Sequence, residues 1–135
     1  MSSRKNASNF FRVQGRYQSL AQFIIPTGNQ ESLTGDGESV STECYHSKIY
    51  SVDSSIKLNL GNGLQDGQMK LITLVHKGSE DQTITLNVPS LKGIFSSIIF
   101  SNMGDQAQVM WTGGSWVVVF TLNSSNPNLL SPLVQ

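Results

Sequence analysis

The chain has 135 residues, of which 38% are apolar and 13% charged, and nine basic residues balance nine acidic ones. This length supports a single domain with a core of its own, and the single cysteine, Cys44, excludes an internal disulfide. No apolar run approaches the ~20 residues of a membrane-spanning helix, and we expect no secretory signal because residues 1–14 lack an apolar stretch. The composition favours a structural or binding protein over an enzyme.

The neutral total divides into two oppositely charged parts. The first 30 residues carry four basic side chains and no acid, whereas the rest of the chain carries five lysines and nine acids, a net charge of −4. We interpret residues 1–22 as a basic arm that either docks on protein, which the apolar residues among its charges favour, or forms a solvated tail. Four charges are few for phosphate contacts, so we do not expect nucleic acid as a partner. The candidate assembly residues are Arg4, Lys5, Phe10, Phe11, Arg12, Arg16 and Tyr17.

After the arm, the sequence is typical of short strands separated by turns. The expected strands, in chain order, cover residues 20–25, 39–50, 55–60, 69–75, 82–88, 94–100, 107–111 and 116–122. Alternation of apolar and polar residues is clearest in 55–60 and 82–88. Residues 69–75 carry apolar side chains on both faces, which favours a central strand, and Gly78–Asp81 is expected to be a hairpin turn. In the last strand Trp116, Val118, Phe120 and Leu122 are expected to share one face.

About eight strands at this spacing predict an all-β fold. We expect a single antiparallel β-sandwich, jelly-roll-like, with extended N- and C-terminal arms. The expected parts are the arm at 1–22, the sandwich at 23–125 and a tail at 126–135. The tail contains four aliphatic residues that need a packing partner, and we expect arm and tail to reach into neighbouring subunits.

Cys44 and His46 are the strongest candidates for catalytic chemistry. They stand two residues apart, so on a strand they would share a face, as a nucleophile and its base must. No glycine-rich turn beside them offers an oxyanion hole, and zinc needs at least three ligands, whereas His76 lies 30 residues further on. We therefore expect no catalytic site, metal site or cofactor, and a small Cys/His hydrolase remains the weakest alternative.

Trp111 and Trp116 flank Gly113–Gly114, a pair that permits positive φ at both centres of a tight hairpin. The two tryptophans would then face each other across the strands. They form either a cross-strand aromatic pair or a platform on which a sugar ring stacks. The second reading leaves a receptor- or carbohydrate-binding module as an alternative function.

Three segments carry a pattern of turns and aromatic residues: Leu60–Ile72, Ser97–Asp105 and Val109–Val118. The first has an Asp-Gly-Gln turn before its strand, the second ends in Gly-Asp, and the third is a Trp-turn-Trp hairpin. This pattern, over about half of the chain, resembles a small β-domain that recurs in viral and phage fibre, tail and capsid-associated proteins. The resemblance implies a non-enzymatic virion subunit that binds copies of itself, often as a trimer, and other capsid proteins. It supplies no active-site residues.

Overall fold

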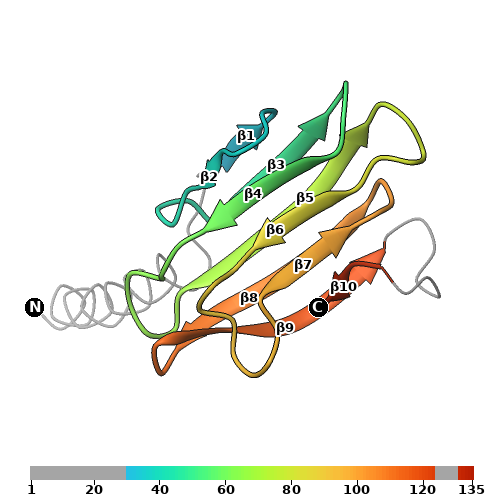
Figure 1. Ribbon diagram of the computed structural model, residues 1–135. Helices are drawn as coiled ribbons and strands as arrows, with labels where there is room; N and C mark the ends of the chain where they lie inside the picture. The colour runs from blue at the N-terminus through green and yellow to red at the C-terminus, as the bar shows by residue number, and fades with distance from the viewer. Residues whose placement is uncertain (1–29, 124–130) are drawn as a thin grey trace, which may run out of the picture.

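A computed structural model describes residues 30–123 and 131–135, and these residues form ten strands and no helix. Two sheets of five strands each make up the fold (Figure 1). The first sheet contains, in spatial order, β1 (Gln30–Leu33), β3 (His46–Ser51), β5 (Met69–Lys77), β8 (Asp105–Thr112) and β9 (Ser115–Asn123). The second contains β10 (Leu133–Val134), β7 (Ser97–Phe100), β6 (Ile84–Asn87), β4 (Ile56–Leu60) and β2 (Ser39–Val40).

The first six strands alternate between the two sheets. As a result β1, β3 and β5 lie side by side in parallel, and so do β2, β4 and β6. The remaining four pairings, which involve β7, β8, β9 and β10, are antiparallel. The expectation of a wholly antiparallel arrangement is therefore wrong for half of the pairings. Side-chain alternation identifies a strand and its buried face, but it carries no information on the direction of the neighbouring strand.

The all-β prediction is confirmed for the described residues, whereas the jelly-roll arrangement and the count of eight strands are not. β1 lies in a polar stretch where no strand was expected, and the single strand expected at 39–50 is divided between β2 in one sheet and β3 in the other. Gly78–Asp81 joins β5 to β6 in the opposite sheet, so it is not the turn of a hairpin. The strand expected at 20–25 lies outside the described residues, as does the whole arm at 1–22.

The apolar core lies between the two sheets, where the alternating strands direct their side chains. Ile56, Leu58 and Leu60 are buried on β4 while the residues between them are exposed, as the alternation predicts. β5 is the central strand of its sheet, and its Ile72 and Leu74 are fully buried. Each such side chain contributes about 1.5–3 kcal/mol of transfer free energy to folding, so these faces fix how the sheets pack.

The turn between β8 and β9 sets the position of the last strand of the first sheet. Gly113 and Gly114 have φ angles of 62° and 81°, and both lie in the left-handed region that favours glycine. The two-residue turn pairs Thr112 with Ser115 and starts a long antiparallel ladder. The turn therefore places β9 beside β8, at the edge of the sheet.

Candidate functional site

β9 forms an open edge of the first sheet. At the start of this strand, the Trp116 amide donates to the Ser90 carbonyl at 2.8 Å, and the Trp116 carbonyl accepts from the Lys92 amide at 3.0 Å. Among the described residues, the rest of the strand pairs only with β8. An unpaired strand edge offers a row of backbone donors and acceptors to any further strand. We call residues 117–122 of β9 the β9 edge.

A β-bulge determines which side chains of the β9 edge face outward. Val118 pairs with Val109, whereas Phe120 pairs with Gln108, so Val119 is an extra residue on β9. One extra residue reverses the facing of every side chain that follows.

The bulge corrects the face expected for this strand. Trp116 is buried and Val118 packs against the core, as predicted. Phe120 and Leu122 instead lie on the outer face with their glutamine partners of β8, and they are 40% and 41% exposed, while Val119 is 48% exposed. The sequence prediction was wrong for the last two positions because alternation within one strand does not reveal a bulge. The outcome is three neighbouring large apolar side chains open to solvent.

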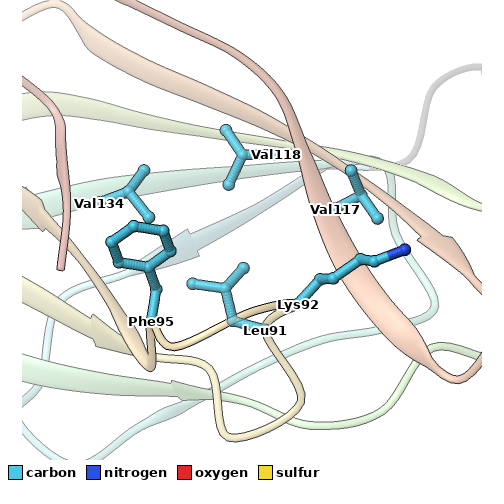
Figure 2. Close-up of a pocket in the computed structure, with 6 residues that line it drawn as sticks. All are labelled: Leu91, Lys92, Phe95, Val117, Val118 and Val134. Atoms are coloured by element: carbon cyan, nitrogen blue, oxygen red, sulfur yellow. The ribbon is translucent and has the colours of Figure 1, made fainter.

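An apolar groove of about 330 Å³ runs beside the β9 edge (Figure 2). Its walls come from three places, namely β9, β10 and the loop between β6 and β7. The lining residues are Leu91, Lys92, Phe95, Val117, Val118 and Val134. Because an apolar cavity of about 150 Å³ accepts one benzene ring, the groove has room for about two bulky side chains.

The loop between β6 and β7 carries an exposed apolar tip next to the groove. Ile94 is 96% exposed and Phe95 is 43% exposed. We expected a strand from residue 94, but β7 begins only at Ser97, and Gly93 takes a φ of 93° in the turn before the tip. A fully exposed isoleucine gains free energy if another surface covers it. The loop tip therefore extends the apolar surface formed by the β9 edge and the groove.

Trp111 and Trp116 form the cross-strand pair that the hairpin implies. Their rings are 5.3 Å apart at an interplanar angle of 66°, an edge-to-face contact. Trp116 is fully buried and its Nε1 donates to the Gly61 carbonyl at 2.8 Å. Trp111 is 9% exposed and packs so closely on Gly63 that a Cβ there would lie 2.3 Å from the Trp111 Cγ. With both rings covered, this pair does not offer a platform for a sugar.

The structure separates the side chains of Cys44 and His46. The His46 Nε2 lies 2.8 Å from the Thr73 hydroxyl on the neighbouring strand. The contact of the Cys44 thiol with His46 is to its backbone carbonyl, at 3.9 Å, and not to its ring. Burial, together with the positive charges of Lys48 and Lys70, lowers the pKa of His46. The expected nucleophile–base geometry is therefore wrong, because Cys44 lies before β3 and does not share its alternation.

Cys44 instead belongs to a polar cluster in which Ser47 and Lys70 are fully buried and the Glu31 side chain is 22% exposed. The Glu31 Oε2 accepts from the Ser47 hydroxyl at 2.5 Å and from the Cys44 thiol at 3.4 Å, and it lies 3.8 Å from the Lys70 Nζ. The Lys70 Nζ donates to the Ser47 hydroxyl at 2.6 Å and lies 3.6 Å from the Cys44 sulfur. Burial lowers the pKa of Lys70, and the nearby Cys44 and Glu31 partly offset this shift.

This cluster contains groups that act as nucleophiles and bases in other sites, but here its contacts link neighbouring strands inside the fold. Lys70 and Ser47 expose nothing to solvent, so a substrate has no access to them. The contacts join β1, β3 and β5 across the sheet. Sequence reasoning did not identify the cluster, although a signal exists: Lys70 occupies the same face of its strand as buried Ile72 and Leu74.

A second polar anchor holds the end of the described chain. Asp105 is fully buried and accepts from the Ser101 and Asn102 amides at 2.9 and 3.0 Å. Its two carboxylate oxygens also accept from the Asn123 side-chain amide and the Ser131 hydroxyl. Beyond this anchor, β10 pairs with β7 of the same chain. Residues 133–134 of the expected tail therefore pair with a strand of their own domain.

In the two described ranges, no group of three or more His, Cys, Asp or Glu side chains is placed to hold a metal ion. The same ranges contain no helix that is long and apolar enough to span a membrane. All seven arm residues named as assembly candidates fall outside the described ranges. The chain matches no protein-family model and no curated protein.

Proposed function

We propose that this chain is a non-enzymatic structural subunit of a virion, of the capsid-associated, cement or fibre type. It assembles with copies of itself and with other capsid proteins, through its β-domain and its terminal segments, and a trimer is the form that the family resemblance implies. The single observation that carries the proposal is the uncovered apolar surface at the β9 edge, the groove and the loop tip.

The β9 edge contains a bulge, which is one feature that keeps soluble sheets apart, but it lacks the charges and prolines that block pairing more directly. Natural edge strands are short, or carry charges, prolines or inward-pointing lysines that block pairing. Residues 117–122 contain neither a charge nor a proline, and five of the six are apolar. Such a segment has high β-propensity and pairs readily with other chains. A strand of this composition is suited to a protein whose working state covers it.

The competing functions receive less support from the described geometry. The hydrolase alternative loses its Cys44–His46 pair, and the Lys70 amine and the Ser47 hydroxyl are fully buried. The carbohydrate-binding alternative loses the tryptophan platform, because both rings are in contact with the core. In the proposed role the two sheets act as a β-sandwich that serves as a rigid carrier of the exposed edge, and no catalytic group is required.

Light scattering on the full chain tests the proposal. Phe120→Lys places a charge on the β9 edge, whereas Val52→Lys places one on the loop after β3, where the side chain is 60% exposed. Both sites are exposed, so both variants are expected to fold. We expect the wild-type protein and the Val52 variant to share one oligomeric mass and the Phe120 variant to have a smaller one. A wild-type monomer at every concentration, or equal masses for all three proteins, would rule the proposal out.

A further inference from the structure

The open edge has a strand-like counterpart in the arm. In Phe10–Tyr17, residues at alternate positions differ in character: Phe11, Val13 and Tyr17 share one face with Gly15, and Arg12 and Arg16 share the other with Gln14. Phe10 is the one apolar residue on the basic side. A period of two over eight residues is the pattern of a strand with one buried face.

The β9 edge provides what such a strand needs. Within residues 30–123 and 131–135 it pairs only with β8, Val117 and Val118 line the apolar groove, and Val119, Phe120 and Leu122 are exposed. Phe10–Tyr17 has eight residues and the β9 edge has six, so the segment is long enough to pair along the whole edge. A peptide that adds to a sheet edge gains affinity from backbone hydrogen bonds and specificity from pockets for alternate side chains.

The basic residues of the segment favour an added strand whose apolar face covers the groove. When Phe11, Val13 and Tyr17 cover the groove, the alternation places Arg12 and Arg16 on the opposite face, away from Lys92 in the groove wall. The arm as a whole carries +4 and the rest of the chain −4, so their attraction favours docking before any contact forms.

We propose that Phe10–Tyr17 of one copy adds as a strand to the β9 edge of a second copy, with its apolar face over the groove. This inference rests on the proposed self-assembly and names the segment that carries it. The described chain begins with β1, at the edge of the sheet opposite β9, about 19 Å away across four strand spacings. The twelve residues between Tyr17 and Gln30 span up to about 40 Å, which is enough to reach a neighbouring subunit.

Exchange between copies accounts for more of the exposed surface than docking within one copy. A single added strand covers the edge and the groove, but it leaves Phe120 and Leu122 on the outer face and Ile94 at the loop tip. When the strand comes from a second copy, the body of that copy is brought against these residues. Each copy then donates one strand and receives one, which gives a dimer or ring when the rotation between copies closes and a filament when it does not.

Cross-linking between distinguishable full-length copies tests the proposal. One tagged copy carries Val13→Cys, and an untagged copy carries Thr121→Cys on the β9 edge; both carry Cys44→Ser so that only the new thiols react. The matched acceptor is Val52→Cys, exposed on a distant loop. A flexible thiol-to-thiol linker tolerates different registers. Docked thiols reach millimolar effective concentrations, so we expect about a hundredfold more tagged–untagged product with Thr121→Cys than with Val52→Cys in micromolar solution.

The outcomes separate this inference from the proposed function. Equal cross-linking of the two acceptors in a protein that still oligomerises overturns the inference and leaves self-assembly in place. A Val13→Cys/Thr121→Cys double variant that links only within single chains overturns the exchange between copies. A monomeric wild-type protein overturns both proposals.

A pair of variants with the native Cys44 gives the same answer if the Cys44→Ser background does not fold. Phe11→Ser with Val13→Ser removes the apolar face of the segment, and Phe10→Ser with Gln14→Ser changes the other face by the same number of residues. We expect the first pair to lower the mass seen in light scattering and the second to leave it unchanged. Equal masses for the two pairs overturn the proposal.

Discussion

The close contact between Gly63 and Trp111 predicts that a larger residue at position 63 destabilises the fold. A Cβ added at Gly63 would lie 2.3 Å from the Trp111 Cγ and 2.6 Å from its Cβ, well inside van der Waals contact. Trp111 cannot retreat freely because it packs edge-to-face on buried Trp116. We therefore expect Gly63→Ala to lower the free energy of unfolding by about 1–3 kcal/mol, as overpacked cores do.

Gly61→Ala is the matched control for this prediction. It lies two residues away, and a Cβ there meets nothing within 4 Å. Neither glycine has a positive φ, so alanine is sterically allowed in both backbones, and at Gly61 it is expected to stabilise by about 0.4–1 kcal/mol through the unfolded state. Urea unfolding followed by tryptophan fluorescence measures both variants. If Gly63→Ala is as stable as Gly61→Ala, the close packing of Trp111 and its exclusion as a binding platform are wrong.

Three further predictions concern the polar anchors. Burial lowers the pKa of Lys70 from 10.5, so between the folded and unfolded pKa values the unfolded chain binds more protons than the folded chain. Raising the pH through that window should therefore increase the free energy of unfolding of the wild-type protein relative to that of Lys70→Met, as measured by urea unfolding. A difference between the two proteins that does not change with pH would contradict this. Ser131→Ala removes a donor to buried Asp105 and should cost about 1 kcal/mol and speed amide exchange in β10, whereas unchanged exchange would refute the anchor. Cys44 is 7% exposed, so a thiol reagent should label the native protein far more slowly than the urea-unfolded protein; equal rates would refute its burial.

Local patterns predicted the strands and the core well, because each depends on residues close in sequence. Alternation in 55–60 identified β4 and its buried face, and two glycines identified the hairpin before β9. The apolar residues on both faces of 69–75 indicated the central strand that β5 forms. In each case the signal and the structure involve the same few residues.

The features that were missed depend on distant partners. Parallel pairing of β3 with β5 joins residues more than 20 positions apart, and no local signal specifies it. The bulge at Val119 changes the facing of Phe120 without any glycine to mark it. The partners of Lys70, namely Glu31, Cys44 and Ser47, come from two segments more than 20 residues before it, so its burial was visible in the alternation but its partners were not. The candidate assembly surface was therefore only partly predictable, through the apolar content of 116–122.

Amide hydrogen exchange of residues 117–122 in the full chain, at high and at low protein concentration, tests the central claim most directly. If the β9 edge is the assembly surface, its amides exchange slowly in the concentrated protein and faster after dilution, while the amides of the central strand β5 stay protected at both concentrations. Exchange at the β9 edge that does not change with concentration, in a protein that light scattering shows to assemble, would contradict the account.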